Sequence, residues 1–309
     1  MVFVNPRSRA NRRDPRLADR FARTLGEVGR VIAPASLDDL MVHAKQLAQS
    51  PPAVIGIHGG DGTLHRTVAA LIQAFRGAGD RALPPIAILA GGTMNVVARS
   101  LGIKARPERL LASLVSASKA GQAPSVVVKR CLQVGGSYGF VFGNGLMANF
   151  LEEYYAKGGY GAGRAVWILT RTLLSALVWG GYARRIFRRY RGRVLVEGQA
   201  LPWKALTGVC AATVREVGLG FKLNHRADED PDRFSVLAIH AGPVTLAQDL
   251  VPVHRGLGVN PRRAWSAVAS KLVIEPEEAE TSYTIDGDLY RASGPLEIGL
   301  GPPLQFVKA

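Results

Sequence analysis

The sequence predicts an α/β N-terminal domain with a doubly wound parallel sheet, followed by a β-sandwich C-terminal domain. In residues 1–123, short apolar runs alternate with segments of helical periodicity, which is typical of a parallel sheet covered by helices. From residue 124 onward, strand-like runs follow one another through tight glycine turns with few helices, as in an antiparallel sandwich. With 309 residues, 47% hydrophobic and 20% charged, the chain is long enough for two separate cores.

The first domain contains four predicted strands, each followed by a predicted helix. The strands are expected at 2–4, 30–33, 53–58 and 85–90. In the first helix Asp14 is expected to cap and Pro15 to occupy the first turn. Its inward face is predicted to comprise Leu17, Phe21, Leu25 and Val28.

Similar signals place the later helices. Ser36 followed by Asp39 predicts a capped helix start. The segment 63–76 predicts a helix, and Pro107 opens another that ends before Gly121. The inward residues expected in the segment 63–76 are Leu64, Val68, Leu71, Ile72 and Phe75.

The second domain is expected over residues 124–298, with a helical insert at 164–190. The boundary near 123 is predicted only to within several residues because no low-complexity linker marks it. A return of residues 299–309 to the first domain is left open.

The charge and the cysteine content of the chain limit the kinds of partner and compartment that we expect. The formal charge of +15 favours a polyanion such as nucleic acid, an anionic membrane, or a phosphate-bearing substrate. Cys131 and Cys210 have no second thiol or histidine at ligand spacing, so we expect reduced, buried core cysteines. The start of the chain lacks a signal-peptide pattern, and the apolar segment 165–183 is interrupted by Arg171, so we expect a cytoplasmic protein without a transmembrane helix.

The run Gly59-Gly60-Asp61-Gly62-Thr63 lies between a predicted strand and a predicted helix. Backbone N–H groups at such a helix start, together with the helix dipole, form an anion site suited to phosphate. Asp61 would repel a phosphate unless a divalent cation or a transferring proton lies between them, which indicates phosphoryl transfer. The alternative is an ordinary glycine-rich turn with an incidental aspartate.

A second loop of the same design makes that alternative weaker. Gly91-Gly92-Thr93-Met94-Asn95 follows the next strand. Because adjacent parallel strands end at the same edge of a sheet, both loops are expected to meet where ligands bind.

Together these motifs resemble the diacylglycerol kinase catalytic-domain family, which includes soluble bacterial lipid kinases and sphingosine and ceramide kinases. The resemblance covers nearly the whole chain: Asn5-Pro6-Arg7-Ser8 comes first, then the two glycine loops, and Asp286-Gly287-Asp288 lies near the C-terminus. The first loop is shared with NAD kinases, and a near variant occurs in phosphofructokinases, so the N-terminal fold is expected to be like theirs. The glycine-rich segment typical of NAD kinases is replaced here by Thr93 to Asn95 and their neighbours.

The resemblance implies an enzyme that uses ATP and Mg²⁺ to phosphorylate a lipid hydroxyl in a cleft between the domains. Asp61 is expected to help hold magnesium and the acceptor, and Asp288 or Asp286 to accept the hydroxyl proton. The residues implied to hold the nucleotide or its phosphates are Asn5, Ser8, Arg9, Gly59, Gly60, Gly62, Thr63, Gly92, Thr93 and Asn95.

Departures from the family pattern leave alternatives open. Asp288 replaces the usual Glu, Val96 replaces an Asp, and Arg9 replaces a Gly. The Asp-Gly pair at 286–287 also suits a type I′ hairpin turn without catalysis. The resemblance also implies a structural magnesium site at Asp232, Glu229 and Phe234, where a solvated acidic loop is the equal alternative.

A basic segment suggests how a lipid would be reached. Eight arginines lie from Arg164 to Arg193, and no acidic residue occurs between Glu153 and Glu197. Apolar and aromatic residues leading into this cluster suit the surface of an anionic membrane, with peripheral association. The alternative is a helix packed on the sandwich with a solvated basic end.

Three functions remain open at this stage: a lipid kinase, a NAD-kinase-like enzyme with a soluble acceptor, and a catalytically weak relative that binds nucleotide and membranes. Nucleic acid is not expected as a partner because the basic residues lie beside apolar aromatics rather than in a nucleic-acid-binding module. A homodimer is left open.

Overall fold

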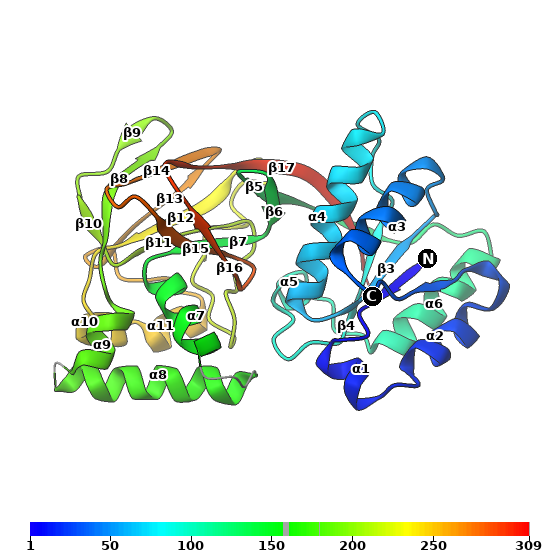
Figure 1. The fold of residues 1–309 in the computed structure, drawn as a ribbon, viewed down its shortest axis with the longest axis horizontal. Coiled ribbons are helices and arrows are strands. Elements are labelled where there is room, and N and C mark those ends of the chain that lie inside the picture. The colour runs from blue at the N-terminus through cyan, green and yellow to red at the C-terminus, as the bar shows by residue number, and fades with distance from the viewer. Residues whose placement is uncertain (157–160, 179, 309) are drawn as a thin grey trace. The chain divides into compact units, whose positions relative to one another are not determined.

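The computed structural model describes residues 1–156, 161–178 and 180–308, and the side chains of residues 9, 10 and 162 also lie outside this description (Figure 1). The chain forms two compact units. One comprises residues 1–129 with 302–309, and the other comprises residues 130–301.

The first unit is built on a parallel sheet with the strand order β17-β4-β3-β1-β2. Its strands are β1 (Val2–Val4), β2 (Val31–Ile32), β3 (Ile55–Gly59), β4 (Ile86–Ala90) and the end of β17 (Leu296–Val307). β1, β3 and β4 are buried almost throughout, as expected for strands covered on both faces.

Helices cover both faces of this sheet (Figure 1). α3 packs against α4, and α2 packs against α6. The helices of this unit are α1 (Arg9–Arg13), α2 (Leu17–Leu25), the 3₁₀ turn η1 (Gly26–Val28), α3 (Leu37–Gln49), α4 (Asp61–Gly77), α5 (Val96–Ser100) and α6 (Pro107–Lys119). The predicted α/β fold with a parallel sheet is confirmed.

Helix starts agree with the sequence in two cases and differ in one. Ser36 Oγ accepts the N–H of Asp39, and Asp39 Oδ2 accepts the N–H of Ala35, so the predicted cap is present. Pro107 opens α6. The expected cap at Asp14 is wrong: α2 begins at Leu17, and the Asp14 carboxylate binds the Arg20 guanidinium instead.

The predicted inward face of this first helix is correct for three residues and wrong for the fourth. Leu17, Phe21 and Leu25 are buried, whereas Val28 is exposed. Gly26 takes a positive φ of 52° and ends α2, so Val28 lies on a 3₁₀ turn outside the helical face.

The second unit contains two antiparallel sheets. One has the order β13-β12-β11-β7-β15-β16, and the other contains β10, β8, β14 and the first part of β17, with β5, β6 and β9. The strands are β5 (Val126–Val134), β6 (Ser137–Gly139), β7 (Val141–Asn144), β8 (Tyr190–Val196), β9 (Gln199–Ala200), β10 (Ala205–Leu206), β11 (Gly208–Ala212), β12 (Phe234–Ile239), β13 (Ala264–Ala269), β14 (Lys271–Pro276), β15 (Thr281–Ile285) and β16 (Asp288–Ala292).

One hydrophobic cluster joins the two sheets. Phe142 and Phe234 from the first sheet and Ile274 and Ile298 from the second are fully buried members of it. Tyr190, Val194 and Val196 of β8 lie in this core, whereas Arg191 and Arg193 are exposed. The predicted C-terminal β-sandwich is therefore confirmed.

Helices of the second unit are more numerous than the sequence indicated. They are α7 (Leu146–Ala156), α8 (Ala162–Leu177), α9 (Gly181–Ile186), α10 (Pro243–Ala247) and α11 (Leu250–Arg255). The expected insert at 164–190 corresponds to α8 and α9, with residue 179 outside the described part of the chain. No helix in the described segments combines the length and apolar character needed to cross a membrane.

Candidate functional site

The first glycine loop joins β3 to α4. The buried β3 ends at Gly59, Gly60 is the residue before the helix, and Asp61 begins α4. A Cβ on Gly59 would lie 2.5 Å from Cβ of Thr63, so glycine is required for the chain to turn this tightly. The amino end of α4 has no side-chain cap, which leaves backbone N–H groups and the positive end of the helix dipole for an anion.

The second glycine loop joins β4 to α5 and closes on itself. Gly92 N–H donates to Asn95 Oδ1 at 2.9 Å, and Asn95 Nδ2 donates to the Gly92 carbonyl at 2.9 Å. Asn95 has a φ of 47°, in the left-handed region that asparagine tolerates better than most residues. Asn95 therefore shapes this loop, whereas Thr93 is exposed at its tip.

The two loops are side by side, as predicted for adjacent parallel strands. Gly91 N–H donates to the Gly59 carbonyl at 2.8 Å. A Cβ on Gly92 would lie only 2.5 Å from Cα of Gly60, so the two backbones meet where neither residue carries a side chain. Asp61 Oδ1 accepts the N–H of Val96, the first residue of α5, at 2.6 Å. The aspartate thus joins the first loop to the helix after the second.

Asn5 extends the same site. Its Nδ2 donates to Thr63 Oγ1 at 3.0 Å, and its N–H donates to the His58 carbonyl at 3.4 Å. Ser8 Oγ accepts the N–H of Asn11 at 3.3 Å, so its hydroxyl helps to start α1. The side chain of Arg9 lies outside the described residues.

The side chain of His58, the residue before Gly59 in β3, packs against Gly91 of the second glycine loop. It is buried, its ring is edge-on to Phe21 at 5.1 Å, and its Nδ1 donates to the Leu89 carbonyl at 2.8 Å. A Cβ on Gly91 would lie 2.5 Å from Cε1 of this ring. Burial lowers the pKa of His58, so the imidazole is neutral near pH 7. Its contact with Gly91 could not be inferred from sequence spacing.

In the second unit, Asp286 and Gly287 form the turn between β15 and β16. Both have positive φ, 49° and 89°, as a type I′ turn requires. Asp286 Oδ1 accepts the N–H groups of Phe140 and Val141 at 2.9 and 2.8 Å. These two donors make Asp286 a link between its turn and β7, a role that its sequence context did not indicate.

Asp288 is the first residue of β16 and is half-buried. It pairs across the hairpin with Ile285. Tyr155 of α7 donates its hydroxyl to the Gly287 carbonyl at 2.7 Å, which attaches the helix to the turn. The structure therefore brings Asp286, Gly287 and Asp288 together on one hairpin within the second unit.

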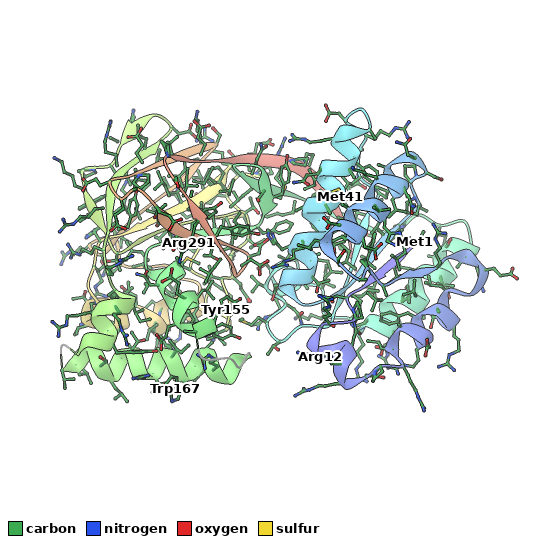
Figure 2. The ribbon with its side chains drawn as sticks, viewed as in Figure 1. Met1, Arg12, Met41, Tyr155, Trp167 and Arg291 are labelled. Atoms are coloured by element: carbon green, nitrogen blue, oxygen red, sulfur yellow. The ribbon has the colours of Figure 1, made fainter. Side chains whose placement is uncertain are left out.

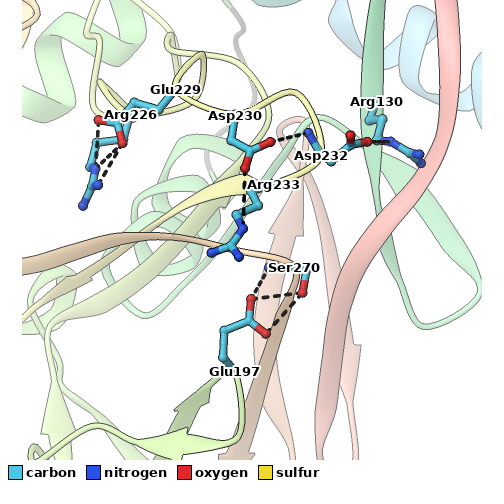
Figure 3. A network of polar contacts seen from close by, with 8 residues as sticks. All are labelled: Arg130, Glu197, Arg226, Glu229, Asp230, Asp232, Arg233 and Ser270. Atoms are coloured by element: carbon cyan, nitrogen blue, oxygen red, sulfur yellow. Dashed lines mark hydrogen bonds and ion pairs between the residues drawn. The ribbon is translucent and has the colours of Figure 1, made fainter.

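The acidic loop before β12 is linked mainly to arginines (Figure 3). Glu229 accepts two hydrogen bonds from Arg226, and Asp232 accepts one from Arg130 at 2.9 Å. Phe234 is fully buried at the start of β12. Within the described residues, no three His, Cys, Asp or Glu side chains are grouped as a metal site built from side chains would require.

The donor set of the first unit suits a phosphate. It combines an uncapped helix start, two loops without side chains at their point of contact, and the exposed hydroxyl of Thr93. Glycine favours close approach of a phosphate to backbone N–H groups because no Cβ intervenes. The Asp61 carboxylate adds the charge that a magnesium ion on such phosphates would need.

Comparison with known proteins gives one family and a set of similar folds. Residues 1–123 match the model of the diacylglycerol kinase catalytic domain. No curated protein sequence matches the chain.

The solved structures similar to this chain include three proteins from Bacillus anthracis str. Sterne. One, described as a diacylglycerol kinase, is 13% identical with a TM-score of 0.66, covering 100% of this chain and 96% of its own. Two more, provisionally assigned as diacylglycerol kinases, are each 16% identical. Their TM-scores are 0.71 and 0.68, and the matches cover 100% of this chain and 94% and 96% of theirs. At these identities the comparison establishes a common fold.

Proposed function

Because residues 1–123 match the model of the diacylglycerol kinase catalytic domain, we propose that the chain is an ATP- and Mg²⁺-dependent lipid kinase. Its acceptor is the hydroxyl of a lipid alcohol such as diacylglycerol or a sphingoid base. The observation that carries the proposal is the pair of glycine loops on adjacent parallel strands, joined by the hydrogen bond from Val96 N–H to Asp61 Oδ1.

The first unit binds and orients the phosphates. ATP supplies the transferable phosphoryl group, and magnesium neutralises charge on its phosphates. Gly60, Gly62 and Gly92 let the phosphates approach the backbone, and the amino end of α4 attracts their charge. Asp61 joins the first loop to the helix after the second, and its carboxylate would help to hold the magnesium ion.

The second unit removes the proton from the acceptor. Asp288 is the proposed base, because Asp286 has already committed its Oδ1 to two backbone N–H groups. A carboxylate within hydrogen-bond reach of the hydroxyl contributes roughly 10² to 10⁴-fold to such a step. Asp286 is proposed as a positioning residue that fixes the turn carrying Asp288.

A second magnesium ion at Asp232, with Glu229 and Phe234, remains a separate proposal. The Asp232–Arg130 ion pair competes with it, because a cation would have to share or displace the guanidinium. Thermal unfolding with and without magnesium tests it: a shift lost in Asp232→Asn and retained in Asp61→Asn supports this site, and no difference between the variants contradicts it.

The function is tested by incubating the protein with γ-labelled ATP, magnesium and separate acceptors: diacylglycerol, sphingosine, ceramide and NAD. Label in a lipid product, absent with Asp61→Asn, is the expected result. Label only in the NAD product would replace the proposal with a NAD-kinase-like activity. ATP binding without any labelled product would indicate a catalytically weak relative.

A further inference from the structure

The outer face of α8 carries large apolar side chains that no described residue of its unit covers. Along the helix, Ala165 and Ile168 are 3% and 0% exposed, whereas Trp167 and Leu174 are 50% and 62% exposed. We define the outer face of α8 as Val166, Trp167, Leu174 and Leu177. Figure 2 draws Trp167 on the side of α8 away from the sheets of the second unit. A contiguous apolar stripe of this kind marks an interaction surface.

Exposed arginines follow this face. Arg184 and Arg185 lie in α9, which packs against α8, and Arg188 follows it. Within the described part of the chain, none of these three forms an ion pair with a carboxylate. The sequence from 154 to 196 contains no Asp or Glu. Arg193 of this region pairs with Glu275 of β14, so the uncompensated charge is that of Arg184, Arg185 and Arg188.

Trp167 and Arg171 form a unit suited to the boundary between water and lipid. The Arg171 guanidinium lies 5.2 Å from the centre of the Trp167 ring and 4.1 Å from that of Tyr182. Aromatic rings beside arginine concentrate at the headgroup level of bilayers, where one side is apolar and the other is charged. Val244 of α10, which packs against α8, adds a further exposed apolar side chain.

We propose that the outer face of α8, flanked by Arg184, Arg185 and Arg188, binds the surface of an anionic lipid bilayer. The inference deepens the proposed lipid kinase by naming the surface on which its substrate is met. Charge complementarity selects this occupant, because the apolar stripe enters the headgroup boundary while the arginines contact anionic headgroups. A second copy of the chain would place two uncompensated basic regions face to face, which is unfavourable.

The same region is physically connected to the proposed base. Tyr154 of α7 packs in the cluster that holds α8, together with Ile168 and Ile186. The next residue, Tyr155, donates its hydroxyl to the Gly287 carbonyl beside Asp288. Two adjacent tyrosines therefore connect the surface that binds lipid to the turn that carries the proposed base.

Vesicle sedimentation of the whole protein tests the proposal without ATP or any lipid alcohol present. Phosphatidylcholine vesicles are compared with vesicles that also contain phosphatidylglycerol. We expect the wild type to sediment with the anionic vesicles and to be released by salt. The triple variant R184Q/R185Q/R188Q should weaken binding roughly a hundredfold, since each basic residue near the surface contributes independently. W167S/L174S should weaken it by at least roughly tenfold through lost apolar burial.

Each variant has a matched control elsewhere on the chain. R23Q/R109Q/R262Q removes the same charge from exposed arginines that form no ion pair with a described residue. L37S/V42S removes exposed apolar side chains from α3, where Leu37 and Val42 are 55% and 53% exposed. Both controls should bind anionic vesicles like the wild type, and circular dichroism should show all variants folded.

The outcomes separate this inference from the proposed activity. Equal binding to both vesicle types, or equal losses in the α8–α9 variants and their controls, overturns the docking surface. A dimer that W167S/L174S converts to monomer while vesicle binding persists assigns the face to a second copy instead. Specific vesicle binding without kinase activity keeps the docking surface and rejects the lipid kinase.

Discussion

Asp61 and Asp286 make the same kind of contact in the two units, but in different surroundings. Each carboxylate accepts backbone N–H groups from a segment remote in sequence: Asp61 from Val96, and Asp286 from Phe140 and Val141. Asp61 begins a long helix beside glycine loops suited to phosphate, whereas Asp286 lies in a hairpin turn. A hydrogen bond between carboxylate and backbone alone therefore does not distinguish the two residues, and the proposed roles rest on the groups around each.

The largest contrast is expected at Asp61. Asp61→Asn keeps an oxygen that accepts the Val96 N–H but removes the charge, so turnover should fall roughly 10³-fold with little change in thermal stability. Asp61→Ala should lose as much turnover and also about 1–3 kcal/mol of the free energy of unfolding. Steady-state kinetics and chemical denaturation measure the two effects. Unchanged turnover in Asp61→Asn would contradict a role of the Asp61 charge in the reaction.

The next contrast lies within the hairpin, at Asp288. Asp288→Asn should lower kcat by roughly 10²-fold or more without destabilising the fold, because the proposed base is lost. Asp288→Glu keeps the carboxylate and should retain activity. Steady-state kinetics of both variants with one lipid alcohol test whether Asp288 is the base. Equal activity of Asn and Glu at this position would show that no proton is taken up there.

In contrast to substitution of Asp288, substitution of Asp286 should reduce the stability of the fold. Asp286→Ala leaves the N–H groups of Phe140 and Val141 without their acceptor, so the free energy of unfolding should fall by about 2–3 kcal/mol. Turnover should fall as a consequence of the displaced turn. Denaturant unfolding of this variant beside Asp288→Asn provides the comparison, and equal stability of the two would contradict the positioning role.

Two glycine substitutions compare the paired glycine loops with the turn held by Asp286. Gly92→Ala places a Cβ 2.5 Å from Cα of Gly60, and Gly139→Ala places one 2.7 Å from Asp286 Oδ2. Overpacking of this kind costs about 1–3 kcal/mol. We expect Gly92→Ala to weaken ATP binding, measured calorimetrically, whereas Gly139→Ala should leave ATP affinity unchanged. Equal ATP affinity in both variants would contradict a phosphate site at the paired loops.

The smallest expected difference is in pH dependence. Burial lowers the pKa of His58, so the native state holds it neutral while the unfolded chain takes up a proton below its ordinary pKa, near about 6.5. Stability contributed by the neutral ring is therefore complete above that pH and is lost as the pH falls toward 5. His58→Asn keeps a donor for the Leu89 carbonyl but cannot titrate. Its melting temperature should fall less between pH 7 and 5, and an identical fall would exclude His58 as the cause.

Local signals in the sequence were sufficient for most of the first unit and less so for the second. Ser36 and Pro107 start helices through contacts within a few residues, so their roles could be predicted. Val28 was misplaced because the end of α2 depends on the backbone of Gly26. α10 and α11 are too short for a periodic pattern to identify them.

For the candidate site, too, contacts between neighbouring elements could be predicted and contacts between remote segments could not. Adjacent strands explain why the two glycine loops were expected to meet. The contacts of His58 with Gly91 and of Asp286 with Phe140 join segments far apart in sequence. Spacing alone cannot encode such contacts, since they depend on how strands pair and helices pack.

β17 determines whether the two units can exist separately. Its first part pairs with β14 in the sandwich, and Phe306 near its end pairs with Ile86 of β4 in the parallel sheet. A chain ending after residue 129 would leave β4 with an unpaired edge, which favours aggregation. A chain lacking the last ten or so residues would be damaged at the same edge despite retaining every residue proposed for catalysis. Exchange of either half during evolution is thereby constrained, because the final strand must be inherited together with the beginning of the chain.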